Sequence, residues 1–168
     1  MTEAQVKNAV EKFEALIRAQ SDRSDKIKAQ GDFIDFKSLD KIIIGVCGGD
    51  GIGPVITKES ARVLEYLLDD KVKAGKIEFK VIDGLTIENR VKANKAIADD
   101  VLEELKSCHV ILKGPTTTPQ AGDPWPNIES ANVAMRKALD LFANLRPVKV
   151  PEQGIDWTFF RENTEGAY

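Results

Sequence analysis

The amino-acid sequence predicts an α/β fold in which helices cover a parallel sheet. Residues 41–47 form a continuous apolar run, which is typical of a central strand buried on both faces. Residues 110–112 form a second apolar run, and apolar residues at helical spacing lie between the two. Strands that alternate with helices favour parallel pairing. We therefore expect ligands to bind beyond the carboxyl ends of these strands.

Composition limits the classes of function. The chain has 168 residues, of which 42% are hydrophobic and 30% charged, as in a globular domain with a sizeable core. A net charge of -3 gives no electrostatic reason to expect nucleic acid or an anionic membrane as partner. Cys47 and Cys108 are isolated, which predicts buried thiols in a reducing compartment. With no apolar run of membrane length and an acidic N-terminus, we expect a cytoplasmic protein.

The N-terminal segment predicts an amphipathic helix over residues 3–20. Its apolar residues recur at spacings of three and four; they are Val6, Val10, Phe13 and Ile17. Residues 21–32 are polar and predict a linker or a frayed helix end. We interpret residues 1–40 as a helical extension that precedes the α/β domain.

The first half of the α/β domain begins with the strand at residues 41–47 and a glycine-rich turn, residues 48–53. Pro54 then occupies the first position of a helix, where its missing N–H costs nothing. The apolar face of this helix is made by Ile56, Val63, Leu64, Leu67 and Leu68.

The remaining elements follow in order. Alternation at Ile77, Phe79 and Val81 predicts a half-buried strand, and a second helix is marked by Ile97, Val101 and Leu105. After the strand at residues 110–112, Ser130 is a suitable N-cap for a helix that extends to about Asn144. The segment 157–160 predicts a strand whose partners come from later sequence.

The glycine turn allows two interpretations. A strand, the turn Gly49-Asp-Gly-Ile-Gly53 and a helix suggest a dinucleotide site. The third glycine comes one residue too early for that motif, and the acidic candidate Asp83 lies too far along the chain. These departures favour a tight turn whose glycines let backbone segments approach closely.

The helix after Ser130 gathers groups that bind carboxylates. Asn132 and Arg136 are four residues apart and share a face, while Ser130 lies at the N-terminus, where free N–H groups favour an anion. Arg146 follows, and arginine binds a carboxylate with two parallel hydrogen bonds. A capped surface helix with solvated arginines is the alternative, and spacing alone leaves both open.

Tyr168 follows Arg161 across a glycine-containing turn. A cation lowers the pKa of a neighbouring tyrosine, so Tyr168 is a candidate general acid. Without other information an ordinary loop tyrosine is the favoured interpretation.

Five segments occur in an order that resembles one enzyme family. They are Gly49-Asp-Gly-Ile-Gly-Pro54, Leu112-Lys-Gly-Pro-Thr-Thr-Thr-Pro119, Ser130-x-Asn-x-x-x-Arg136, Asp140-Leu-Phe-Ala-Asn-Leu-Arg-Pro147 and Phe160-Arg-Glu-Asn-Thr-Glu-Gly166. Together they resemble the isocitrate/isopropylmalate dehydrogenases, over about residues 41–168. The resemblance implies the parallel-sheet fold of that family, incomplete in this chain, and a structural role for the glycine turn.

The resemblance also implies roles for single positions. The substrate's carboxylates would be held by Ser130, Asn132, Arg136, Arg146 and Arg161. The nicotinamide side of the site would be contacted by Lys113, Thr118 and Asn132. Tyr168 would protonate the carbon left behind by decarboxylation. No metal ligand is expected within this chain.

Substrate choice within the family is indicated by Ser130 and Asn132. Isopropylmalate carries an alkyl group where isocitrate has its third carboxylate, so polar residues at these positions favour isocitrate. The implied reaction is the oxidative decarboxylation of isocitrate to 2-oxoglutarate, a step of the tricarboxylic acid cycle, by a homodimer with NAD or NADP and Mg²⁺ or Mn²⁺. Isopropylmalate, homoisocitrate and tartrate relatives remain alternatives.

The family's proteins are about twice as long or more. We therefore expect residues 41–145 to form the first part of a large domain and residues 146–168 the truncated start of a small one. The metal ligands and a lysine base would lie beyond Tyr168, so residues 1–168 alone should be inactive. A non-catalytic truncated or split half that acts in assembly is the rival class.

Overall fold

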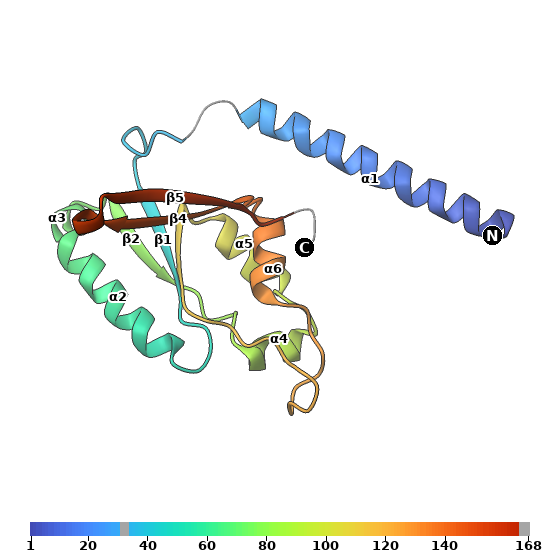
Figure 1. Ribbon diagram of the computed structural model, residues 1–168. Coiled ribbons are helices and arrows are strands. Elements are labelled where there is room, and N and C mark those ends of the chain that lie inside the picture. The colour runs from blue at the N-terminus through green and yellow to red at the C-terminus, as the bar shows by residue number, and fades with distance from the viewer. Residues whose placement is uncertain (31–33, 165–168) are drawn as a thin grey trace. The chain divides into compact units, whose positions relative to one another are not determined.

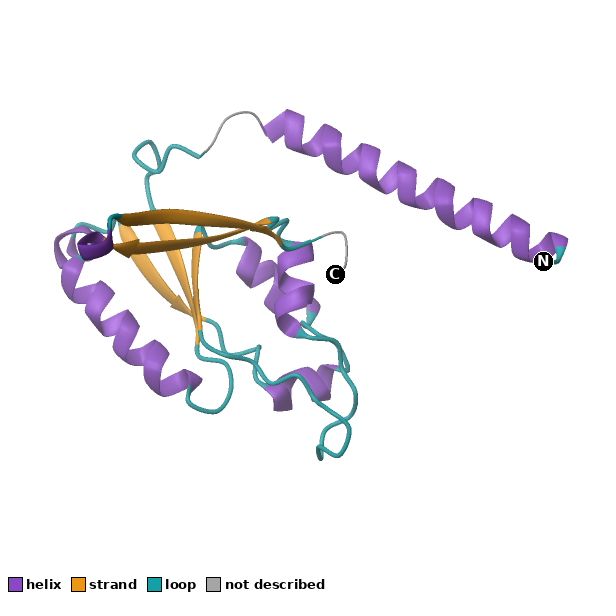
Figure 2. Ribbon diagram, viewed as in Figure 1, coloured by secondary structure: helices purple, strands orange, loops and turns teal. Residues whose placement is uncertain are grey.

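The computed structural model describes residues 1–30 and 34–164 (Figure 1). The chain divides into two compact units, Met1–Leu39 and Asp40–Tyr168. The strands of the described residues all lie in the second unit, where they form two separate sheets (Figure 2).

The first unit contains the long helix α1, Glu3–Gln30. The segment predicted as a linker or a frayed helix end belongs to α1 as far as Gln30, so the linker is wrong there. This part has no glycine or proline, and pairs such as Asp25 with Lys28 at i,i+3 support a helix. Residues 31–33 of the predicted linker lie outside the described residues. The predicted apolar stripe is exposed, with Phe13 at 64%. None of the helices described, α1 included, has the length and hydropathy needed to cross a membrane.

A three-stranded parallel sheet forms the centre of the second unit. Strand β1 (Ile42–Cys47) lies between β2 (Ile77–Val81) and β3 (Val110–Lys113), so the predicted parallel sheet is confirmed. The side chains of Ile44, Val46 and Cys47 are buried, as expected of a central strand. Figure 1 shows α2 (Gly53–Leu67) on one side of the sheet and α5 (Asp99–Lys106) on the other.

Two short helices were not predicted, α3 (Asp69–Lys73) and α4 (Ile87–Ala93). Their sequences are mostly polar and too short to show a periodic apolar pattern. Helix α4 is defined by its ends: the Thr86 hydroxyl accepts a hydrogen bond from the Asn89 N–H (3.4 Å), and Asn94 adopts a left-handed conformation at φ 50°.

The predicted core face of α2 is exposed at several positions. Ile56, Val63 and Leu67 are 45%, 54% and 66% exposed, whereas the buried residues of α2 are Gly53 and Thr57. A pocket of about 550 Å³ opens between α2 and β2, but none of the residues of the predicted face lines it. Leu64 and Leu68 are half-buried, so the described segments cover only part of the apolar side that periodicity had identified.

Helix α6 (Ala131–Ala138) is shorter than predicted. Asp140 adopts φ 52°, and its N–H donates to the carbonyl of Lys137. The N–H of Leu141 donates to the carbonyl of Arg136 at 2.8 Å. These are the two hydrogen bonds of a Schellman motif, which ends the helix before Asn144.

The segment after α6 forms an antiparallel hairpin. Strand β4 (Ala143–Val150), the 3₁₀ turn η1 (Pro151–Gln153) and strand β5 (Ile155–Glu162) follow one another. The expectation that residues 157–160 pair with later sequence is therefore wrong, because Trp157 pairs with Val148 and Phe160 with Leu145. Most of the hairpin is exposed, and Phe160 reaches 73%.

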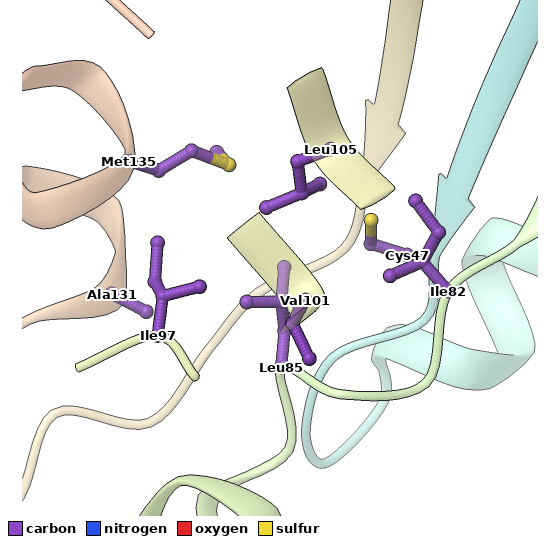
Figure 3. Packing of buried hydrophobic residues seen from close by; sticks show 8 residues of the cluster. All are labelled: Cys47, Ile82, Leu85, Ile97, Val101, Leu105, Ala131 and Met135. Atoms are coloured by element: carbon purple, nitrogen blue, oxygen red, sulfur yellow. The ribbon is translucent and has the colours of Figure 1, made fainter. Parts of the chain in front are cut away.

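The buried core connects α5 and α6 to the ends of the central strands. Figure 3 shows Val101 and Leu105 of α5 between the α6 side chains and those of Cys47 and Ile82. The α6 members of the cluster are Ala131 and Met135. Helix α6, which with its N-cap carries three of the five predicted substrate residues, is thus fixed to the sheet by apolar packing.

We expect Cys47 to resist alkylation in the folded protein. Its side chain is fully buried, and burial raises the pKa of its thiol from 9.0 to about 11. Between these two values the folded state keeps a proton that the unfolded state loses, so stability should fall as pH rises through this window. Iodoacetamide labelling at pH 8 followed by mass spectrometry should modify Cys47 only in denaturant. Fast labelling of native Cys47 would contradict the packing described above.

Candidate functional site

The glycine turn and the loop after β3 meet backbone to backbone. The N–H of Asp50 donates to the carbonyl of Pro115, and the N–H of Gly114 to that of Cys47, both at 2.8 Å. A Cβ atom on Gly49 would collide with the Pro115 carbonyl, and one on Gly114 with the Gly48 carbonyl. Only glycine permits this approach, which brings the carboxyl ends of β1 and β3 into one site.

Asp50 holds two further segments against the turn. Its Oδ1 accepts from the Ile87 N–H at 2.8 Å, and its Oδ2 accepts from the Thr117 N–H at 2.6 Å. The carboxylate therefore connects the glycine turn to the start of α4 and to the loop after β3. Two charge-assisted hydrogen bonds to backbone N–H groups are strong anchors.

Arg90 of α4 is completely buried and bonds only backbone carbonyls in the described part of the chain. Nε donates to Ala96 (2.9 Å), Nη1 to Thr117 (2.7 Å) and Nη2 to Glu129 (2.8 Å). Burial lowers the pKa of Arg90, and the Asp50 charge opposes this shift. This side chain joins both ends of the loop that connects β3 to α6.

Lys113 stands at the end of β3 and is half-buried. Its Nζ donates to the carbonyl of Gly114 (2.8 Å) and to the Thr116 hydroxyl (3.2 Å). Burial is the main cause that lowers the pKa of Lys113; interactions with Cys47 and Asp50 oppose this shift, and the positive charges of Arg90 and Arg136 add to it. Lys113 and Arg136 therefore share one electrostatic environment, although they come from different elements.

The N-terminus of α6 presents the predicted substrate residues. Ser130 occupies the N-cap position with φ −61° and ψ 123°, but its side chain makes no capping hydrogen bond. Ser130, Asn132 and Arg136 are half-buried, and Thr118 in the preceding loop is exposed. The helix does not use the Ser130 hydroxyl, which leaves that group available to a ligand.

Arg146 and Arg161 lie on one face of the hairpin. In the antiparallel register Arg146 pairs with Phe159 and Arg161 with Asn144, so the two arginines are diagonal neighbours. Arg146 Nε donates to Asn144 Oδ1 at 3.1 Å. Tyr168 lies outside the described residues.

Comparison with known proteins identifies the family. Residues 43–168 match the model of the isocitrate/isopropylmalate dehydrogenases, which is most of the chain. The chain belongs to this family.

Similar proteins include the isocitrate dehydrogenase [NADP] of Caldococcus noboribetus, which is 36% identical over 139 residues, 77% of this chain and 31% of that protein. The isocitrate dehydrogenase [NADP] of Archaeoglobus fulgidus is 38% identical over 140 residues, 77% of this chain and 32% of its own length. That of Staphylococcus epidermidis is 38% identical over 131 residues, 71% of this chain and 30% of its own length. The chain thus spans about a third of the length of these curated relatives.

Two residues that shape this family member's site were not predicted. Asp50 was treated as part of a structural turn, although an acidic residue inside a glycine turn after a strand is a usable signal. Arg90 gave no local signal, because it lies in a polar segment and its acceptors are distant in sequence.

Side chains of the types that ligate metals do not form a cluster in the described residues. In residues 1–30 and 34–164, no three His, Cys, Asp or Glu side chains come close enough to hold an ion.

Proposed function

We propose that the complete protein is an NADP-dependent isocitrate dehydrogenase that converts isocitrate to 2-oxoglutarate and carbon dioxide. The observation that carries the proposal is Ser130, whose hydroxyl lies at the N-terminus of α6 without a capping hydrogen bond. The names of the similar proteins, isocitrate dehydrogenase [NADP], support the substrate and the nucleotide.

The substrate's charge matches the side chains. In our proposal Ser130, Asn132 and the free N–H groups of α6 bind one carboxylate. The other two carboxylates are held by Arg136, Arg146 and Arg161 through bidentate hydrogen bonds. An alkyl group in place of the first carboxylate would leave the polar groups at Ser130 and Asn132 unpaired, which disfavours isopropylmalate.

The nucleotide side is assigned to Lys113, Thr118 and Asn132. The nicotinamide ring, when bound, accepts the hydride from the hydroxyl carbon. Thr118 is exposed beside the anchored Thr117, which suits contact with a ribose hydroxyl. Tyr168 is proposed to donate the final proton to the carbon that loses carbon dioxide.

A homodimer is also proposed for the complete enzyme. Large apolar side chains are exposed on the hairpin, among them Trp157 at 59% and Phe160 at 73%. Such side chains favour burial against another polypeptide.

Direct binding tests the substrate. Isocitrate added to residues 1–168 should shift the amide NMR signals of Ser130 and Asn132, and isopropylmalate should bind at least about tenfold more weakly, or about 1.4 kcal/mol. Equal affinity for the two acids would contradict the proposed specificity. Preference for isopropylmalate or homoisocitrate would identify a relative with another substrate, and absence of binding would favour the assembly role.

The reaction itself is tested in a joined enzyme, in which residues 1–168 continue into the Archaeoglobus fulgidus relative beyond its matched region. We expect it to reduce NADP with isocitrate, whereas residues 1–168 alone should not. A joined enzyme that folds and binds isocitrate but reduces neither NADP nor NAD would contradict the proposed activity.

A further inference from the structure

The loop between β3 and α6, residues 114–130, contains no helix or strand. Loops of this length inside a compact domain are uncommon and are usually functional. Two residues predicted to contact ligands, Thr118 and Ser130, lie near its opposite ends. Their relative position therefore depends on what holds this loop.

Arg90 holds the loop at both ends. Its Nη1 bonds the carbonyl of Thr117, directly before Thr118, and its Nη2 bonds the carbonyl of Glu129, directly before Ser130. The two acceptors belong to one planar guanidinium, whose donor geometry is rigid. The separation of the two backbone segments is thus set by a single side chain.

Asp50 completes the arrangement on the Thr117 side. Both backbone polar groups of Thr117 are hydrogen-bonded. Its N–H donates to Asp50 Oδ2 at 2.6 Å, and its carbonyl accepts from Arg90 at 2.7 Å. The other oxygen of Asp50 bonds the N–H of Ile87, in the first turn of the helix that carries Arg90. The Thr117 end of the loop is therefore fixed in orientation as well as in position.

We propose that Arg90 is a positioning residue that fixes Thr118 on the nucleotide side relative to Ser130 on the substrate side. This inference rests on the proposed function for the identity of the two ligands. Neither ligand touches Arg90, because its guanidinium is fully buried and its hydrogen bonds go to backbone carbonyls. Its effect on the reaction passes through the two loop ends.

Stability alone gives a weak reason for an arginine here. Burying a charge is costly, and apolar residues of similar volume often replace buried ionic groups with neutral or favourable effect on stability. An apolar side chain, however, cannot bond two carbonyls and set their separation. Hydride transfer is sensitive to such placement, because a misplacement of about 1 Å can cost about a hundredfold in rate.

The first test measures loop order in residues 1–168 without any ligand. By ¹⁵N relaxation, the order parameters of Thr118 and Ser130 should be about 0.85 in the unchanged chain and below about 0.6 in Arg90→Met. Asp50→Asn should loosen Thr118 more than Ser130, because Asp50 bonds only the Thr117 end. The control Lys92→Met, an exposed position on the same helix, should change neither.

The second test separates positioning from binding in the joined enzyme. Arg90→Met should lower kcat for isocitrate at least about 30-fold while KM changes less than about threefold, because each ligand still has its own contacts. Arg90→Lys keeps the charge but loses the planar fork, so it should restore part of kcat. A general loss of structure would instead lower the amount of active enzyme without rescue by lysine.

Each outcome decides the proposal. Rigid Thr118 and Ser130 in a folded Arg90→Met chain would overturn it, as would an unchanged kcat. If Arg90→Met does not fold, Arg90→Lys replaces it in both tests. Rigid Thr118 and Ser130 together with an unchanged kcat in Arg90→Lys would then contradict the proposed role of Arg90. If the unchanged joined enzyme does not oxidise isocitrate, the proposed function fails, while the relaxation measurement still decides the role of Arg90.

Discussion

Replacing Gly49 by alanine should produce the largest loss of stability in the glycine turn. Gly49 has φ 71°, a left-handed conformation that costs an alanine about 1 kcal/mol. The new Cβ would also collide with the carbonyl of Pro115, and overpacking of this kind adds roughly 1–3 kcal/mol. The sum is a large share of the stability of a typical domain, roughly 5–15 kcal/mol. Thermal unfolding followed by circular dichroism should show a midpoint lower by roughly 10 °C.

Gly51 provides a matched control in the same turn. It has φ 57°, but in the described structure no heavy atom outside Gly51 and its two chain neighbours lies within 4 Å of the position that its Cβ would take. Gly51→Ala should therefore cost only the conformational term, about 1 kcal/mol. Equal midpoints for the two variants would show that the close approach of Pro115 does not limit stability.

The elements that sequence predicted well are those with local causes. The apolar run at Ile42–Cys47 became the central strand, and Pro54 lies in the first turn of the following helix, one residue after its start at Gly53. Both signals depend on neighbouring residues only. The parallel pairing of the three strands followed from their alternation with helices.

The errors arose where a long-range contact or an unusual backbone angle decides the structure. The end of α6 depends on Asp140 at φ 52°, and aspartate there is a weaker stop signal than glycine. The predicted helix extended to about Asn144 and so included the first two residues of β4, because residues 138–142 keep a helical spacing of apolar side chains. The rest of β4 was not predicted. Periodicity likewise identified the apolar face of α2 but could not indicate whether a later segment covers it.

The residues of the candidate site also fall into those with a local sequence signal and those without one. Ser130, Asn132 and Arg136 were accessible to prediction because one helix carries them at a fixed spacing. Asp50 and Arg90 act across the chain, on Thr117 and on Glu129, and no local pattern encodes those acceptors. The positions of the residues proposed to contact a ligand were therefore easier to predict than those of the residues that hold the loops in place.

Ser130→Leu should separate ligand binding from helix capping. A serine that caps a helix contributes about 1 kcal/mol to stability, but the Ser130 side chain makes no capping hydrogen bond. The unfolding midpoint should therefore change little. Isocitrate affinity should fall more than about tenfold, or 1.4 kcal/mol, because the leucine removes a polar contact and places an apolar group against a carboxylate.

Ser60→Leu is the control for this change, since Ser60 is an exposed helical serine on α2 that bonds only the carbonyl of Ile56 in the described structure. It should leave isocitrate affinity unchanged. The comparison is made by titrating isocitrate into both variants of residues 1–168 and by measuring kcat/KM in the joined enzyme. If isocitrate affinity falls less than about tenfold in Ser130→Leu while the unfolding midpoint is lowered, Ser130 stabilises the helix and does not bind the substrate. The reverse pattern, full stability with lost affinity, is what an unused hydroxyl at the N-terminus of α6 predicts.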